Sequence, residues 1–137
     1  MKTLRLLFLL LLLGLRASAQ TNEVDLTAAF TQLKGNGPVP FANALYGIDL
    51  DSARQLANQL TPLLRQAGEY TGHEILSRNP LTKRIERLTI VIYFEHFPVF
   101  MRLDYYDTPR GKICLPAFVT RDASAVLPFD LISATGK

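Results

Sequence analysis

The sequence contains no tryptophan, two histidines and one cysteine in 137 residues. A single thiol, Cys114, excludes an intramolecular disulfide, so the hydrophobic core must hold the fold together even in an oxidising compartment. Cys114 lies in a strand-like stretch, where a buried and inert thiol is the ordinary interpretation and a reactive thiol is the alternative. The sequence also lacks the closely spaced ligands of zinc sites, so it indicates no metal and no cofactor.

The first residues have the three parts of an export signal. Lys2 and Arg5 precede an unbroken apolar run over residues 6–13, and Ala-Ser-Ala at residues 17–19 provides the small side chains that signal peptidase accepts. The apolar stretch is roughly ten residues, whereas a helix needs about twenty to cross the hydrocarbon core. We therefore predict that residues 1–19 are a cleaved signal peptide, that the mature protein has no membrane span, and that it is periplasmic or secreted.

Cleavage of this signal peptide changes the charge of the chain. Lys2, Arg5 and Arg16 are removed with it, so the basic count falls from 15 to 12 and equals the 12 acidic residues. Nucleic-acid binding usually needs an excess of clustered basic residues, so a neutral mature domain argues against that function. The remaining length suffices for one core. We assign it to one domain, residues 20–121, and a C-terminal tail, residues 122–137.

The first part of the mature chain has a helical pattern. Apolar residues at three- and four-residue steps predict a helix over residues 23–33, with Gly35 just past its end. Asn-Gly-Pro at residues 36–38 and Pro40 then interrupt the pattern. We expect a loop or an irregular turn from there to Gly47.

A longer amphipathic helix follows this loop. Asp49 or Asp51 is a suitable N-cap, apolar residues recur at three- and four-residue steps, and Gly68 ends the pattern. Pro62 is expected to kink this helix or break it near Asn58. The opposite side is polar, as in a helix that lies on a sheet with one face in water.

The rest of the domain changes to a β pattern with short turns. Candidate strands lie near residues 69–78, 84–95, 98–107 and 112–121. Strands without intervening helices form an antiparallel meander, so the fold class is α+β, with N-terminal helices packed on a four-stranded antiparallel sheet. Pro116 lacks a ladder donor and favours a sheet edge or a bulge.

The central hairpin has a testable register. A two-residue turn at His96-Phe97 places the apolar residues of both strands on one face. The predicted pairs on that face are Phe94–Val99, Ile92–Met101, Ile90–Leu103 and Leu88–Tyr105. The predicted pairs on the other, mixed face are Tyr93–Phe100, Val91–Arg102, Thr89–Asp104 and Arg87–Tyr106.

Several short motifs carry a family resemblance. They are EYTGHEIL at residues 69–76, Glu-Arg at 86–87, YFEHFPVF at 93–100 and Tyr-Tyr at 105–106. Over roughly residues 50–119 the pattern resembles small exported bacterial proteins of the NTF2-like, cystatin-like superfamily. The resemblance implies a strongly curved antiparallel sheet wrapped around the helices as a cone. In that family the interior can hold a small ligand and the outer face often pairs two subunits.

This fold does not by itself select a function, because it carries isomerases, dehydratases and non-catalytic domains. In an enzyme of this type a carboxylate acts as base inside the cone, beside a tyrosine or a protonated acid. Asp104 and Tyr106 could form such a pair in a small lyase or isomerase. The register places them on the mixed face, where Asp104 beside Thr89 and Tyr106 beside Arg87 are ordinary cross-strand partners.

The histidines and their acidic neighbours are the other candidates for acid–base or metal chemistry. They are His73 with Glu74, and Glu95 with His96. On a strand, His73 and Glu74 point to opposite faces, and His96 lies in the predicted turn. Their spacing therefore argues against a shared site.

Two surfaces remain as candidates for binding. One is the basic run around the turn at residues 79–80, which consists of Arg78, Lys83, Arg84 and Arg87. These side chains could bind anionic lipid or polysaccharide. The alternative is that they protect the sheet edge from pairing with other chains.

The second surface is the face that bears Val91, Tyr93 and Phe100, because adjacent aromatics on a wet face usually need a cover. One cover is a second copy in a homodimer. The alternative cover is the C-terminal tail, which would fold back through Leu127, Phe129 and Leu131.

We therefore expect an exported, non-catalytic NTF2-like domain that binds a small apolar ligand or a protein partner in the cell envelope. The alternatives are the lyase or isomerase that uses Asp104 and Tyr106, and a structural envelope protein whose cone is filled.

Overall fold

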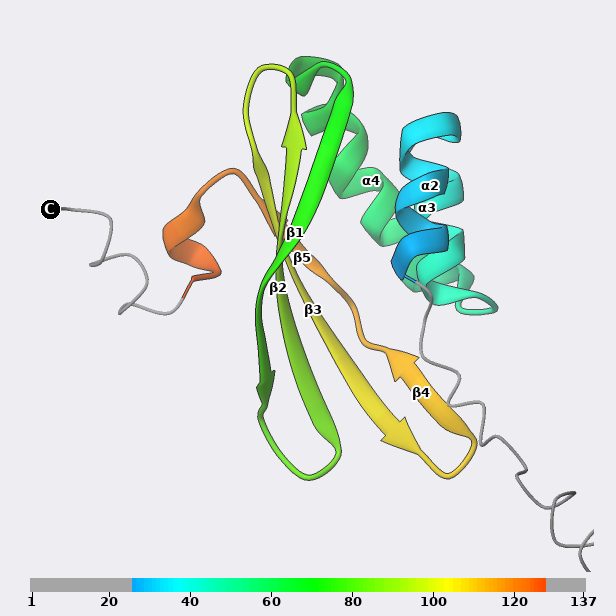
Figure 1. The fold of residues 1–137 in the computed structure, drawn as a ribbon. Coiled ribbons are helices and arrows are strands. Elements are labelled where there is room, and N and C mark those ends of the chain that lie inside the picture. Colours follow the sequence, from blue (N-terminus) through cyan, green and yellow to red (C-terminus); the bar gives the residue numbers. More distant parts are fainter. Residues whose placement is uncertain (1–25, 128–137) are drawn as a thin grey trace, which may run out of the picture.

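The computed structural model describes residues 26–127, which form three helices packed against a curved antiparallel sheet (Figure 1). The helices are α2 (Leu26–Asn36), α3 (Pro38–Tyr46) and α4 (Leu50–Ala67). The strands are β1 (Tyr70–Pro80), β2 (Ile85–Phe94), β3 (Val99–Thr108), β4 (Gly111–Cys114) and β5 (Phe118–Thr120), followed by a short 3-10 helix, η1 (Ala123–Ala125). The strands are ordered β1-β2-β3-β4, and β5 also pairs with β3. The predicted α+β class with helices before the sheet is confirmed.

The loop expected before Gly47 is in fact helix α3, so that prediction is wrong. Pro38 and Pro40 lie in the first turn of α3, where backbone N–H groups have no partner within the helix and proline costs little. Helix α2 also continues through Gly35 instead of ending before it. The two helices are separated at Gly37, whose φ of 89° is in the left-handed region that favours glycine.

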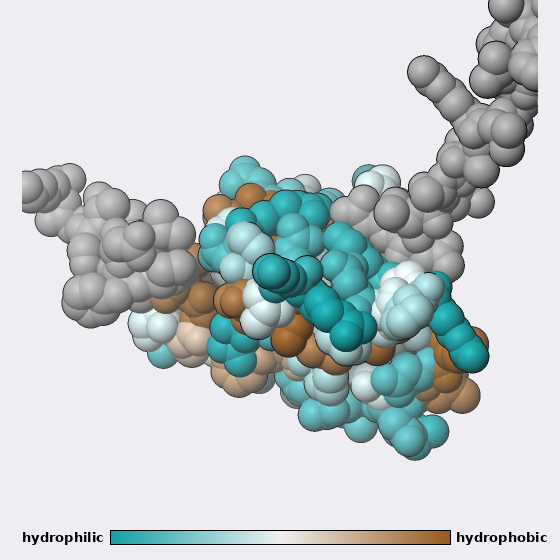
Figure 2. Space-filling view, turned by 90° about the horizontal axis from the view of Figure 1, so that it is seen from below, coloured by the Kyte–Doolittle hydropathy of each residue, from teal (hydrophilic) through white to brown (hydrophobic). Residues whose placement is uncertain are grey.

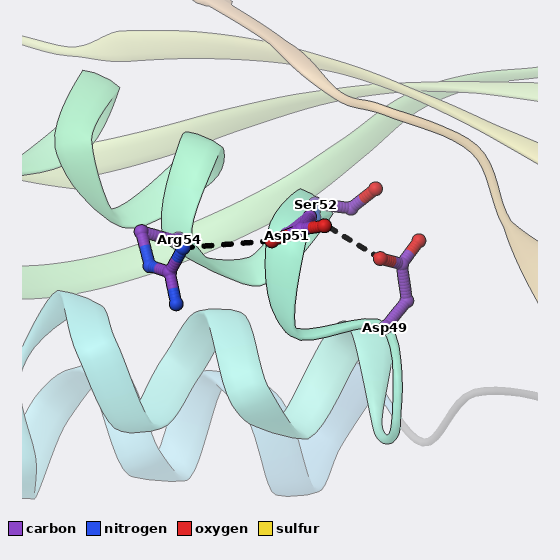
Figure 3. Close-up of polar contacts among 4 residues, drawn as sticks. All are labelled: Asp49, Asp51, Ser52 and Arg54. Atoms are coloured by element: carbon purple, nitrogen blue, oxygen red, sulfur yellow. Dashed lines mark hydrogen bonds and ion pairs between the residues drawn. The ribbon is translucent and has the colours of Figure 1, made fainter.

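Helix α4 begins and ends where the sequence indicates. The Asp49 carboxylate accepts a hydrogen bond from the Ser52 backbone N–H at 3.1 Å, whereas Asp51 lies in the first turn and pairs with Arg54 (Figure 3). The helix is continuous through Pro62, so the predicted break is wrong. An internal proline costs about 3 kcal/mol, and burial of large side chains, roughly 1.5–3 kcal/mol each, offsets it. The buried side of α4 consists of Ala53, Leu56, Ala57, Leu60 and Ala67.

The central hairpin has the predicted faces but not the predicted register. Val99 pairs with Ile92 and not with Phe94, so every predicted pair is displaced by two residues. The chain beyond Phe94 bonds elsewhere: the N–H groups of Glu95 and His96 donate to the carbonyls of Glu69 and Ala67, at 3.0 and 2.9 Å. An even displacement keeps each side chain on its face, which is why the faces are correct although the partners are not.

The predicted fourth strand is interrupted at Pro116, as its missing N–H group indicates. Strands β4 and β5 both pair with β3, with a register change between them. The hydroxyl of Tyr46 on α3 holds this interruption, since it donates to the Leu115 carbonyl at 3.1 Å and accepts from the Ala117 N–H at 2.7 Å.

The hydrophobic core lies between the helices and one face of the sheet. Alternate residues of β3 are buried, which matches the predicted apolar face. The strand residues of this core are Leu88, Ile90, Ile92, Phe94, Val99, Met101, Leu103, Tyr105 and Cys114. The opposite face of the sheet, which we call the outer face, carries the alternate side chains of the same strands.

Candidate functional site

A pocket of about 350 Å³ opens where the end of α2, the end of α4 and the start of β1 meet. This volume lies at the lower end of the range of small-molecule sites, roughly 300–1,000 Å³. Four hydrophobic or aromatic side chains and two exposed charged ones surround it, and its lining surface is as polar as it is apolar. The lining residues are Leu33, Lys34, Gly35, Gly37, Leu64, Gly68, Glu69, Tyr70 and Phe94.

Glycines shape this pocket in two ways. A Cβ atom at Gly35 or Gly37 would meet nothing within 4 Å, so these positions leave space open. A Cβ atom at Gly68 would lie 2.6 Å from Glu95 Oε2, so glycine permits a close approach there. That same carboxylate oxygen accepts a hydrogen bond from the Glu69 N–H at 3.0 Å, which fixes the chain where α4 passes into β1.

Tyr70 and His73 form a hydrogen-bonded pair beside the pocket. The Tyr70 hydroxyl lies 2.6 Å from His73 Nδ1, and the imidazole stacks on the Phe30 ring with centroids 3.7 Å apart. Partial burial lowers the pKa of His73 and raises the pKa of Tyr70. The two shifts favour a neutral imidazole and a neutral phenol, and the imidazole tautomer decides which of the two groups donates.

Sequence reasoning did not identify the part that Tyr70 plays in this pair. In a regular strand, residues three apart point to opposite faces. The register shift between Tyr70 and Gly72 turns both aromatic rings toward Phe30 on α2. A glycine within a strand is the available signal for such a bulge.

The other acid–base candidates lie on the outer face and in the β2–β3 turn. Glu74 lies on the outer face, where its carboxylate accepts a hydrogen bond from the Tyr93 hydroxyl at 3.2 Å, so His73 and Glu74 do point to opposite faces as predicted. Glu95 and His96 lie in the β2–β3 turn. Within residues 26–127, no group of three or more potential metal ligands comes together.

Asp104 is held by Arg87 on the outer face. The guanidinium Nε and Nη2 atoms donate to the two carboxylate oxygens at 2.8 and 2.7 Å. Asp104 is thus a cross-strand partner, but of Arg87 and not of Thr89, because the register is displaced. Tyr106 pairs with Ile85 and not with Arg87, and the Arg84 guanidinium lies 4.8 Å from its ring centroid. Neither Asp104 nor Tyr106 lines the pocket.

The three residues proposed for a sheet-face interface differ in exposure. Tyr93 is 37% exposed, Phe100 is half-buried and Val91 is only 3% exposed. Phe118, on β5, is 41% exposed and contacts Arg102 through its ring. The aromatic residues of the outer face are therefore Tyr93, Phe100, Tyr106 and Phe118. Of the tail residues offered as a cover, Leu127 is half-buried, and Phe129 and Leu131 lie outside the described residues.

Cys114 is buried on β4, and its thiol lies 3.5 Å from the Leu115 carbonyl oxygen. Burial raises the pKa of this thiol to about 12. A thiol with so high a pKa has little thiolate at neutral pH, which favours the inert interpretation.

No protein-family model, curated protein or solved structure matches this chain. None of the helices in residues 26–127 combines the length and the hydropathy that a membrane-crossing helix needs.

Proposed function

We propose that this chain is an exported, non-catalytic binding domain that holds a small apolar molecule in the pocket between α2, α4 and β1. The observation that carries the proposal is the pocket itself, with Leu33, Leu64 and Phe94 among its walls. Apolar walls with a few polar groups are typical of small-molecule sites. Tyr70 is the polar group best placed to orient a ligand, because its hydroxyl is already fixed by His73.

The polar groups around the pocket support binding more than catalysis. The hydrogen-bonded pair beside it, Tyr70 and His73, bonds internally. The carboxylate of the lyase or isomerase alternative, Asp104, is neutralised by Arg87. The NTF2-like resemblance and the export signal belong to this proposal as expectations. The export signal gives the compartment in which the domain would meet its ligand.

The proposal is tested by native mass spectrometry of the protein recovered from an exporting host. We expect an extra mass of roughly a few hundred daltons, the range of ligands that such a pocket encloses. Gly35→Phe adds a large side chain at a pocket-lining position where a Cβ atom meets nothing within 4 Å, and it should reduce the bound fraction. Gly35→Ala is the matched control and should retain it. Absence of an added mass, together with no binding of the neutral probe N-phenyl-1-naphthylamine, would favour the structural alternative.

A second candidate function is homodimer formation through the outer face. Tyr93 and Phe118 leave aromatic surface exposed on a face where the helices do not pack. Exposed aromatic patches often mark protein interfaces. A second copy would cover this surface without competing for the pocket, which lies on the side of the helices.

A further inference from the structure

Two hairpin turns lie side by side at the end of the sheet drawn lowest in Figure 1. They are the β1–β2 turn, residues 81–84, and the β3–β4 turn, residues 109–110. The Arg84 carbonyl accepts from the Asp107 N–H at 2.8 Å, and the Arg84 guanidinium donates twice to the Asp107 carbonyl, at 3.0 and 2.8 Å. The two turns are therefore joined into one surface, which we call the two-turn tip.

Basic side chains are concentrated at the two-turn tip. Its cations are Arg78, Lys83, Arg84, Arg110 and Lys112, and its anions are Glu86 and Asp107. Glu86 lies 3.5 Å from both Arg78 and Lys112, so one carboxylate is shared by two cations. A positive excess therefore remains, although the basic and acidic residues of the mature sequence are equal in number.

Hydrophobic side chains accompany these cations. Leu81, in the β1–β2 turn, is 46% exposed, and Ile113, on β4, is 48% exposed. The Leu81 N–H donates to the Ile85 carbonyl at 2.8 Å, so the turn backbone is ordered while the side chain reaches solvent. Figure 2 views the molecule from this end and shows hydrophobic atoms interspersed among hydrophilic ones on the surface.

We propose that the two-turn tip docks on the surface of an anionic phospholipid bilayer. Lys83, Arg84 and Arg110 would meet the phosphate groups, and Leu81 would enter the boundary between headgroups and acyl chains. Exposed apolar residues flanked by basic ones are the combination that interfacial binding requires. Protection of the sheet edge accounts for the charges but gives no reason for an exposed leucine among them. An anionic polysaccharide would likewise need the cations and not Leu81.

The test measures co-sedimentation of the protein, as recovered from an exporting host, with large vesicles. One set contains phosphatidylcholine alone and the other an equal mixture of phosphatidylcholine and phosphatidylglycerol. We expect binding to the anionic vesicles only, and we expect it to weaken as salt is raised from about 0.05 M to about 0.5 M. One basic residue near an anionic membrane strengthens binding roughly five-fold, so Lys83→Ala with Arg110→Ala should weaken it about 25-fold.

Two further variants separate this proposal from its rivals. Arg54→Ala with Arg65→Ala removes the same charge from exposed positions on α4 and should leave vesicle binding nearly unchanged. Leu81→Ser should weaken vesicle binding and leave any binding to dextran sulfate unaltered. Failure to bind anionic vesicles at low salt, or an equal loss in the α4 control, would overturn the proposal. Binding to dextran sulfate and vesicles alike, with no effect of Leu81→Ser, would assign the tip to polysaccharide instead.

Discussion

Arg87 and Asp104 face each other across β2 and β3 and are joined by two hydrogen bonds, at 2.8 and 2.7 Å. The side chains are 32% and 20% exposed, so solvent screens the pair only in part. Such a two-point contact holds the two long strands in register on the outer face. It also raises the pKa of the Arg87 guanidinium, chiefly through the hydrogen bonds to Asp104.

The first prediction separates this structural role from catalysis. Asp104→Asn should lower the free energy of unfolding by about 1 kcal/mol, because one charge-assisted pair is lost at a partly exposed site. Binding of N-phenyl-1-naphthylamine should not change, since Asp104 does not line the pocket. Urea unfolding and probe fluorescence measure the two effects. The double variant with Arg87→Gln is the control, and it should cost less than the sum of the single changes. Loss of probe binding without loss of stability would place Asp104 in the site.

The second prediction concerns the interruption between β4 and β5. Tyr46→Phe removes the hydroxyl that accepts from the buried Ala117 N–H and donates to the Leu115 carbonyl. Buried groups left unsatisfied cost about 1–3 kcal/mol, so we expect a loss of that size in urea unfolding followed by circular dichroism. Tyr93→Phe also removes a hydrogen bond from a tyrosine hydroxyl, but at an exposed site, so it should lower the free energy of unfolding much less. Equal losses in the two variants would show that the Tyr46 contacts do not hold the strand ends.

The sequence predicts the layers of this fold better than its local contacts. The alternation along β3 identifies the buried face correctly, because side-chain direction depends only on the strand period. It cannot identify the partner residues, because the register also depends on contacts distant in sequence. The chain after Phe94 bonds to Glu69 and Ala67, which precede β1. Helix α3 escapes prediction because Pro38 and Pro40 fall in the one turn that tolerates proline.

The sequence reveals less of the pocket than of the fold. Its residues come from α2, α4, β1 and β2, and no motif links them. The pairing of Tyr70 with His73 depends on a bulge whose signal in the sequence is a single glycine, Gly72. The basic residues around the β1–β2 turn, in contrast, are close together in the sequence, so the sequence identifies them. The sequence does not show that the β3–β4 turn lies beside them.

The third prediction follows from the lowered pKa of His73, which partial burial causes. The imidazole takes up a proton less readily in the folded chain than in the unfolded chain, where its pKa is near 6.5. The unfolded state therefore gains stability relative to the folded state as pH falls through that value. We expect the melting temperature to decrease between about pH 7.5 and pH 5, and to decrease less in His73→Gln. His96→Gln, in the exposed turn, is the control. An unchanged pH profile in His73→Gln would contradict this assignment.

The fourth prediction tests the outer face as a homodimer interface. Tyr93→Lys with Phe100→Glu places charges on two of the four aromatic positions of this face, and burial of unpaired charges would make association costly. If the unaltered protein is a dimer, light scattering coupled to gel filtration should show the double variant as a monomer. Ile48→Lys introduces a charge at a fully exposed position in the α3–α4 connection, away from this face, and should leave the dimer intact. A dimer that persists in the double variant would exclude these residues from the interface, whereas a dimer lost equally in Ile48→Lys would place the contact on the helices.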